Sequence, residues 1–217
     1  MGNYPLLTAT QPQARTIERR CFCYTTNMPL EQVKLPVTEA PELGHAIGEG
    51  GVAVAEYPTD GLGPTHLTSE GFRDCKGITI YDSDAKRGLL AHIAEAPDPE
   101  ETLRAIIEAY GGDLLNSDIH IVHTRQLESN NSAGFYEKNW PDTQTITDFF
   151  MKHSPKSIRV DANEDQHPQR SIALNLQDEA VTQYDGVAGR AESQPPNVSV
   201  SRPIHPHPKL DHTKFSF

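Results

Sequence analysis

Three things are scarce in this sequence: cysteine, positive charge and long apolar segments. It contains three cysteines, an odd number that does not suit the disulfide framework of a small secreted domain, so we expect a reducing compartment such as the cytoplasm. Lysine and arginine together number 19 against 30 aspartates and glutamates, which leaves a formal net charge of −11. Binding a nucleic-acid backbone needs clustered positive charge, and we therefore expect no nucleic-acid partner.

No segment approaches the length of a membrane-spanning helix, and the N-terminus lacks a basic region followed by an apolar one. We therefore expect neither a membrane span nor a signal peptide. A chain of 217 residues is long enough for one domain with a substantial core, with or without tails.

Composition divides the chain into a central domain and two flanking segments. Residues 1–43 contain five prolines, which exclude a long helix and predict a proline-rich N-terminal arm. Residues 186–217 are rich in Pro, Ser, Gly and His without a sustained apolar period, which predicts a solvated tail. The domain itself is expected over residues 44–185. The Cys21–Cys23 pair has no second pair of cysteines to complete a metal site, so we expect no metal.

Two β-rich segments around a polar turn predict a hairpin inside this domain. Residues 78–81 (Ile-Thr-Ile-Tyr) alternate, residues 82–87 are polar, and residues 88–93 form an apolar return strand. Such a hairpin brings Cys75, at the start of the first strand, near His92 in the second. A thiol beside an imidazole is the minimal set for covalent catalysis, because the imidazole takes the proton and the thiolate attacks a carbonyl carbon. A buried structural cysteine is the alternative.

A helix is predicted directly after the hairpin. Asp98 suits its N-cap and Pro99 its first turn, while Gly111 suits its C-terminal end. Apolar residues recur between these signals at helical spacing: Leu103, Ile106, Ile107 and Tyr110. This pattern predicts a helix that packs on the core.

A strand and a second helix are predicted further along the chain. Residues 119–123 are predicted to form a strand. His120 and His123 would point to opposite faces of it, so they are poorly placed to bind one metal ion together. Residues 142–152 read as a helix with apolar side chains along one side. His66, which is close to Cys75 in sequence, is a second candidate for the general base, but we expect it to be a surface histidine.

The segment Leu67-Thr68-Ser69-Glu70-Gly71-Phe72-Arg73-Asp74-Cys75 resembles the CheD family of chemoreceptor glutamine deamidases. That family has Leu-Thr-Thr-x-Gly-x-Gly-Ser-Cys, followed by a strand, a turn containing Asp, and Gly-Gly-x-x-His. Residues 47–55, which begin Ile-Gly-Glu, look like its opening strand. Residues 158–163 and 170–176 resemble its closing pair of strands, so that the likeness spans about residues 44–185.

The resemblance implies roles for three residues. Carried over position by position, Cys75 is the nucleophile and His92 the general base. Ser69 takes the place of a threonine that helps to orient the histidine.

The sequence departs from the family pattern at Arg73-Asp74, where the family has Gly-Ser. Arg73 carries a side chain where a glycine would let the backbone come close to the substrate amide. Asp74 would disfavour the thiolate by like-charge repulsion if it points inward. Together with Thr68, these two residues are expected to contact the substrate. Asp161 and Asn163, at the end of a predicted strand, are further candidates to border the site.

The fold implied by the resemblance is α+β, with packed mixed β-sheets in a sandwich-like arrangement and flanking helices. The implied function is that of a protein glutamine deamidase that needs no cofactor and no metal. Its expected partner is a protein substrate, either a chemoreceptor or a host protein. In the second case the protein would be an effector translocated into the host cytosol, because deamidating bacterial toxins share the Cys-His architecture. Two alternatives stay open: a binding module that has lost catalysis, and an amidohydrolase acting on N-terminal Asn or Gln.

Overall fold

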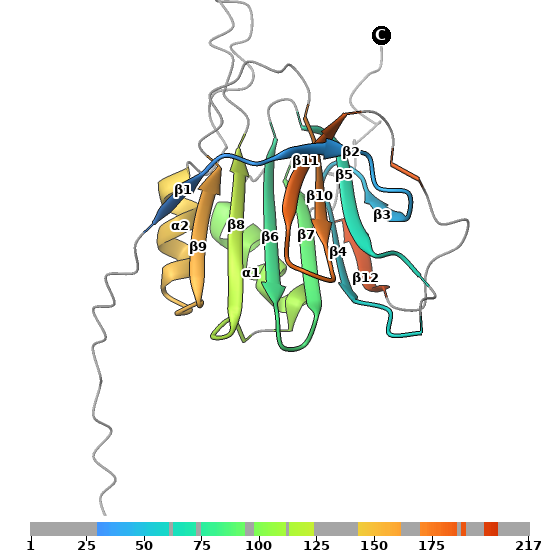
Figure 1. Ribbon diagram of the computed structural model, residues 1–217. Helices are drawn as coiled ribbons and strands as arrows, with labels where there is room; N and C mark the ends of the chain where they lie inside the picture. The colour runs from blue at the N-terminus through green and yellow to red at the C-terminus, as the bar shows by residue number, and fades with distance from the viewer. Residues whose placement is uncertain are drawn as a thin grey trace, which may run out of the picture.

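Two mixed β-sheets packed face to face form the body of the protein (Figure 1). The structure, a computed structural model, describes residues 30–60, 63–72, 75–93, 98–111, 113–123, 143–161, 170–185, 188–189 and 198–203. Within this part, two helices cover the outer face of the larger sheet. The expected α+β class, with packed mixed sheets and flanking helices, is confirmed.

The described part of the chain forms seven strands of one sheet and five of the other. The elements are β1 (Glu31–Val33), β2 (Val37–Glu39), β3 (Gly44–Ile47), β4 (Gly51–Glu56), β5 (His66–Phe72), β6 (Lys76–Asp82), β7 (Arg87–Ile93), α1 (Pro99–Tyr110), β8 (Ser117–His123), α2 (Thr143–Met151), β9 (Ser157–Asp161), β10 (Arg170–Asn175), β11 (Val181–Asp185) and β12 (Val198–Pro203). The larger sheet has the order β1-β9-β8-β6-β7-β4-β12, and the smaller sheet has the order β2-β11-β10-β5-β3.

The predicted hairpin lies at the centre of the larger sheet as β6 and β7. The two strands are antiparallel, and Gly77 stands directly opposite His92. The polar turn between them is held by the Asp82 carboxylate, which accepts hydrogen bonds from the backbone N–H groups of Asp84 and Ala85 at 2.9 and 3.0 Å. This is an Asx turn, and it explains why the polar segment reverses the chain at this point.

Alternation along the strands of the larger sheet separates two hydrophobic cores. Ile78 and Ile80 of β6 pack against the helices, while Tyr81 and the preceding Cys75 face the smaller sheet. The two sheets approach closely because two positions of the hairpin lack side chains. A Cβ at Gly88 would lie 2.7 Å from Leu176, so this position admits only glycine without repacking.

The first helix, α1, begins and ends where the sequence indicates. The Asp98 side chain accepts a hydrogen bond from the N–H of Glu101 at 3.0 Å, and Gly111 closes the helix in a left-handed conformation with φ of 109°. The predicted apolar side is buried as expected: Leu103, Ile106, Ile107 and Tyr110. The second predicted helix is confirmed as α2, although its expected first residue, Asp142, lies outside the described residues.

The boundary expected before residue 44 lies too late in the chain. β1 pairs with β9 and β2 pairs with β11, so the segment before residue 44 crosses from the edge of one sheet to the edge of the other (Figure 1, dark blue). Leu35, between these strands, is buried in the core between the sheets. Part of the expected C-terminal tail is also sheet, because β12 pairs antiparallel with β4.

Two strand predictions from the family likeness need correction. Residues 47–55 are not one opening strand: β3 ends at Ile47, a turn follows, and β4 begins at Gly51 in the other sheet. Gly50 has a φ of 70° and supplies the backbone conformation for this turn. The two strands expected at residues 158–163 and 170–176 are present as β9 and β10, but they do not pair with each other, because β9 lies in the larger sheet and β10 in the smaller.

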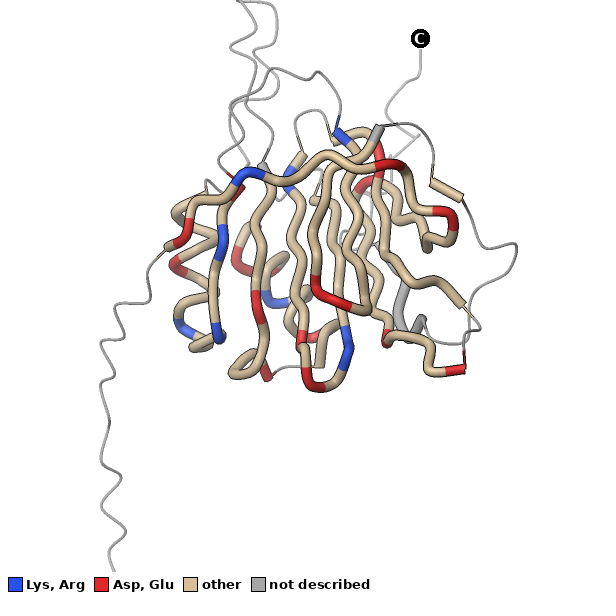
Figure 2. Tube along the Cα trace, viewed as in Figure 1, with Lys and Arg blue, Asp and Glu red and all other residues tan. Residues whose placement is uncertain are grey.

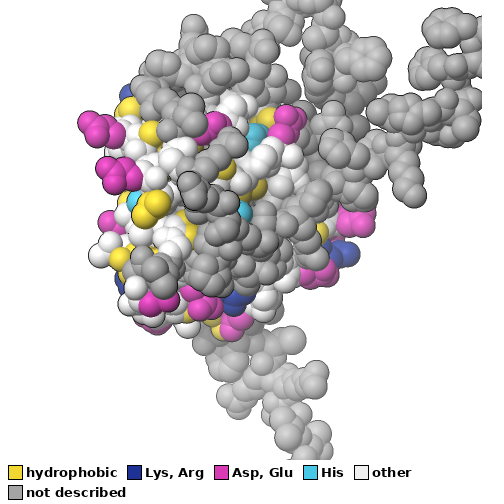
Figure 3. Space-filling view, turned by 90° about the vertical axis from the view of Figure 1, so that its right-hand side faces the viewer, with side chains coloured by type: hydrophobic (Ala, Val, Ile, Leu, Met, Phe, Trp, Pro, Cys, Tyr) yellow, Lys and Arg dark blue, Asp and Glu magenta, His cyan; other side chains and the backbone are white. Residues whose placement is uncertain are grey.

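Charged residues are dispersed over the described surface. Asp and Glu outnumber Lys and Arg along the described trace, and neither kind gathers on one side of it in this view (Figure 2). The face seen in Figure 3 likewise mixes apolar, acidic and histidine side chains where it is described. Neither described helix has the length and apolar character needed to cross a membrane.

Candidate active site

His92 lies on the face of β7 that points toward the smaller sheet, and its side chain is 1% exposed. Its Nδ1 is 2.8 Å from the Oγ of Ser69 on β5. The imidazole therefore bridges the two sheets by a hydrogen bond. The sequence resemblance named Ser69 and His92 as a pair, and the structure brings them into contact.

A second hydrogen bond of Ser69 decides the tautomer of His92. The Ser69 hydroxyl is 2.7 Å from the backbone carbonyl oxygen of Ile47, to which it donates its single proton. The Ser69 Oγ must then accept from His92, so Nδ1 carries the ring proton. The lone pair is left on Nε2, which has no hydrogen-bond partner among the described residues. A buried imidazole with a free lone pair on Nε2 is arranged to accept a proton.

The turn between β3 and β4 holds the backbone of His92 as well. The N–H of Gly50 donates to the His92 carbonyl oxygen at 2.8 Å. The same turn carries Ile47, which accepts from Ser69. Sequence reasoning read this segment as one strand and missed its part in the site. The Gly48-Glu49-Gly50-Gly51 run was the available signal, since glycines at this density favour a turn over a strand.

Phe72 covers one face of the His92 ring. The two ring centroids are 3.9 Å apart and the planes differ by 13°, which is a stacked arrangement. Room for Phe72 comes from Gly77, because a Cβ at that position would lie 3.1 Å from the Phe72 ring. Sequence reasoning did not identify Phe72 as part of the site.

Burial keeps His92 neutral. Removal from water lowers the pKa of its imidazole from 6.5 to about 4, because the charged form loses its hydration. At neutral pH the ring is therefore an uncharged base, and it does not form a resting ion pair by itself.

Cys75 lies directly before β6 and is 7% exposed. It belongs to the core between the sheets, on the side of β6 toward which His92 points. Gly77, two residues later, stands opposite His92 in the sheet. Diagonal neighbours of this kind have Cα atoms roughly 7–8 Å apart in an antiparallel pair, within reach of a long side chain. The register therefore places Cys75 on the same side of the larger sheet as His92, although Nε2 of His92 makes no hydrogen bond to its thiol. The catalytic contact between the two side chains stays a prediction.

The other expected site residues are not gathered there. Thr68 is buried on the opposite face of β5 from Ser69, where its side chain lies against Gly44 and beside Tyr184. Successive side chains of a strand point to opposite faces, so the expected contact of Thr68 with substrate conflicts with its position. Arg73 and Asp74, the two departures from the family pattern, lie outside the described residues.

Asp161 has a structural rather than a site-bordering position. Its carboxylate is fully buried, receives a hydrogen bond from Arg170 and lies 3.4 Å from the backbone N of Leu35. Arg170 also donates to Gln183 at 2.8 Å. This network ties β9, β10 and β11 to the crossing segment between β1 and β2. Asn163 lies outside the described residues.

Three further histidines were candidates in the sequence: His66, His120 and His123. His66 is bonded through Nδ1 to the hydroxyl of Thr65 at 2.8 Å and is half-buried at the start of β5, three residues before Ser69. His120 lies opposite Thr79 of β6 and is buried, which lowers the pKa of its imidazole to about 4. The side chain of His123 is outside the described part, so the expected divergence of His120 and His123 stays a prediction.

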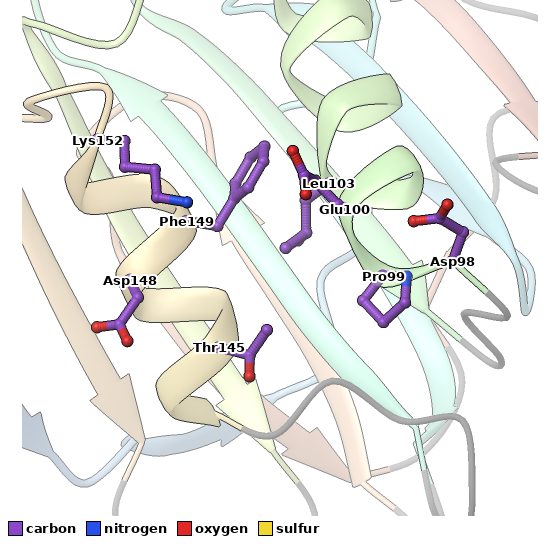
Figure 4. A pocket seen from close by; sticks show the side chains of 8 residues that line it. All are labelled: Asp98, Pro99, Glu100, Leu103, Thr145, Asp148, Phe149 and Lys152. Carbon is purple, nitrogen blue, oxygen red and sulfur yellow. The ribbon is translucent and has the colours of Figure 1, made fainter.

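A separate pocket lies on the helix side of the larger sheet. Its volume is about 330 Å³, and it opens between the first turn of α1 and the side of α2 (Figure 4). Carboxylates and one amine surround an apolar floor, and the lining residues are Asp98, Pro99, Glu100, Leu103, Thr145, Asp148, Phe149 and Lys152. It contains neither a thiol nor an imidazole, and the larger sheet separates it from His92. We therefore do not assign it to the candidate active site.

Within the described residues, no three side chains of His, Cys, Asp or Glu gather closely enough to hold a metal ion. The sequence matches no protein-family model, and no curated protein is significantly similar to it. The function of the site therefore has to be inferred from its own residues and geometry.

Proposed function

We propose that this protein is a cysteine-dependent protein glutamine deamidase, which converts a glutamine side chain of a partner protein into glutamate. The observation that carries the proposal is the orientation of His92. Ser69 binds its Nδ1–H, its Nε2 is left as a neutral base, and Cys75 directly precedes β6 on the side of the larger sheet that carries His92. The resemblance of residues 67–75 to the CheD segment supports glutamine as the substrate.

In the first step the Cys75 thiol gives its proton to Nε2 of His92 as its sulfur attacks the substrate. The sulfur attacks the carboxamide carbon, and the resulting oxyanion is stabilised by backbone N–H groups near Cys75. Since the pKa of free His92 is lowered to about 4, proton transfer accompanies attack instead of preceding it as a stored ion pair. The C–N bond then breaks, His92 returns its proton to the leaving nitrogen, and ammonia departs.

The thioester left on Cys75 is resolved by water. His92 takes a proton from the water molecule, hydroxide adds to the thioester carbon, and the C–S bond breaks. The thiolate recovers the proton from His92, so the products are glutamate, ammonia and the starting enzyme. This sequence consumes one water and needs no redox partner.

The substrate is a folded or extended protein rather than free glutamine. A free glutamine offers little surface for recognition, so specificity must come from docking of the surrounding partner. The proposed partners are a chemoreceptor or, for a translocated effector, a host protein.

A second candidate is a binding module that has lost catalysis. The burial of both Cys75 and His92 favours it, because a glutamine side chain must reach the thiol for reaction. In that case the Ser69–His92 bond would serve only to join the sheets. The two candidates differ in whether Cys75 has a reactive thiol.

The test is incubation of the full chain with bacterial and with eukaryotic lysate, scored by peptide mass spectrometry for glutamine converted to glutamate. Wild type is compared with Cys75→Ser, and a Cys21→Ser/Cys23→Ser variant is the matched control that retains Cys75. Conversion at one or a few sites by wild type and the control, lost in Cys75→Ser, supports the proposal and identifies the substrate. Absence of conversion in both lysates, together with no alkylation of Cys75 near neutral pH, refutes it in favour of the binding module.

A further inference from the structure

The strand that carries Ser69 contains a bulge next to the candidate active site. On β10, Arg170 and Ile172 are two residues apart, while their partners on β5, Phe72 and Ser69, are three residues apart. β5 therefore holds one extra residue in this interval. Gly71 lies there with a φ of 77°, a left-handed conformation that glycine adopts without strain.

The bulge changes which side chains face His92. In a regular strand, residues three apart point to opposite faces, so Ser69 and Phe72 would lie on different sides of the sheet. In this structure Ser69 bonds to His92 and Phe72 stacks on the same ring. The extra residue has therefore turned Phe72 to the Ser69 side.

We propose that Phe72 is a positioning residue for the deamidation reaction, and that the Gly71 bulge exists to place its ring on His92. Together they form what we name the Phe72 clamp, consisting of the bulge at Gly71 and the stacked Phe72 ring. This inference rests on the proposed function, because it assigns the clamp the task of aiming the Nε2 of His92.

The contacts explain how the clamp works. The His92 ring is attached through Cβ, and the hydrogen bond from Nδ1 to Ser69 limits its rotation about the Cβ–Cγ bond to the small range of lengths and angles that a hydrogen bond tolerates. The stacked Phe72 face narrows this range further, and Phe72 is itself fully buried over Gly77. With the plane and one atom fixed, the direction of Nε2 is fixed too. Reaction at a positioned base is sensitive to small errors of this direction.

Glycine is needed at position 71 because of its backbone conformation and not because space is short. A Cβ built on Gly71 meets nothing within 4 Å, so a side chain fits there. Only the positive φ is demanding, and asparagine tolerates that conformation while a β-branched residue does not. Gly71→Asn should therefore keep the clamp, and Gly71→Val should weaken it.

The test uses two readouts on the full chain. The ring ¹⁵N chemical shifts of His92 report its tautomer, and peptide mass spectrometry follows alkylation of Cys75 by iodoacetamide at pH 7. Phe72→Leu keeps an apolar side chain but removes the stacking face. Phe150→Leu is the matched control, because Phe150 is also fully buried but lies in the core on the helix side of the sheet.

We expect Phe72→Leu to keep the Nδ1–H tautomer of His92, because Ser69 still binds it, and to slow alkylation of Cys75 about ten-fold, as suits the loss of one aromatic pair. Phe150→Leu should leave both readouts at the wild-type values. Gly71→Val should behave like Phe72→Leu, and Gly71→Asn should behave like wild type. If Phe72→Leu does not fold, the two Gly71 variants test the Phe72 clamp in its place.

The clamp is overturned if Phe72→Leu and Gly71→Val keep the wild-type alkylation rate. The proposed function survives that result provided that His92→Asn still slows alkylation. If His92→Asn alkylates as fast as wild type, His92 is not the base, and the proposed function falls together with the clamp.

Discussion

Mild acid should destabilise this protein through His92. In the folded state burial lowers the pKa of this imidazole to about 4, whereas in the unfolded chain it has its ordinary value of 6.5. Above pH 6.5 the ring is neutral in both states, so its titration does not change the free energy of unfolding. As the pH falls from 6.5 toward 4, the unfolded chain binds a proton that the folded protein does not, so the free energy of unfolding decreases.

The size of the effect follows from the two pKa values. One unit of pKa corresponds to about 1.4 kcal/mol, so His92 lowers the free energy of unfolding by about 2–3 kcal/mol at pH 4.5. Well below pH 4 both states are protonated, and the free energy of unfolding does not decrease further because of His92. The side chain is 1% exposed, so solvent screening does not reduce this value much.

The perturbation is His92→Asn, which removes the titrating ring and keeps an amide N–H near the former Nδ1 for Ser69. Urea unfolding followed by circular dichroism at pH 7 and pH 4.5 gives the decrease in stability for each protein. Between pH 7 and pH 4.5 the free energy of unfolding should fall by about 2–3 kcal/mol less in His92→Asn than in wild type. The cavity left by the ring affects both pH values equally and cancels in this comparison.

His66→Asn is the control, because His66 is only half-buried and Asp178 opposes the lowering of its pKa by burial. His66→Asn should therefore alter the pH-dependent fall in the free energy of unfolding less than His92→Asn does. An equal pH dependence in wild type and His92→Asn would show that His92 is not held neutral in the fold. The reasoning on its role as a neutral base would then be wrong.

Three further outcomes are expected. Ser69→Ala should give a mixture of the two His92 tautomers in ring ¹⁵N spectra, whereas Ser69→Thr keeps the hydroxyl and should keep the single Nδ1–H tautomer. A mixture in both variants would contradict the assigned hydrogen bond. Asp98→Ala should lower the free energy of unfolding by about 1 kcal/mol through loss of the helix cap, with Asp98→Asn near wild type in the same urea titration. Arg170→Met should lower the free energy of unfolding by about 3–5 kcal/mol, because it removes the arginine that pairs with the buried carboxylate of Asp161. Adding Asp161→Leu should recover part of this loss. A loss under 1 kcal/mol for Arg170→Met would refute the buried pair.

Local signals were enough to predict the elements at the centre of the fold. The cap at Asp98, the end at Gly111 and the apolar period between them act within one helix, and α1 spans the predicted residues. The hairpin of β6 and β7 follows in the same way from alternation on both sides of a polar turn. Such signals can be read from sequence because each depends on a few neighbouring residues.

The edge strands carry no comparable signal. β1 and β2 are exposed along most of their length, so their residues need not alternate between apolar and polar. What holds them is backbone pairing with β9 and β11, which are more than 100 residues away. The proline-rich composition of this segment therefore suggested a loose arm where the fold forms strands.

The sequence by itself named Cys75 and His92 as a candidate pair, because a hairpin must bring its two strands together. Its likeness to the CheD segment added Ser69. Only the tertiary structure decided that His92 presents Nε2 as its base, since this depends on the carbonyl of Ile47 in a strand from elsewhere in the chain. The role of Phe72 depended on it too, because one extra residue in β5 reverses the face on which a side chain lies.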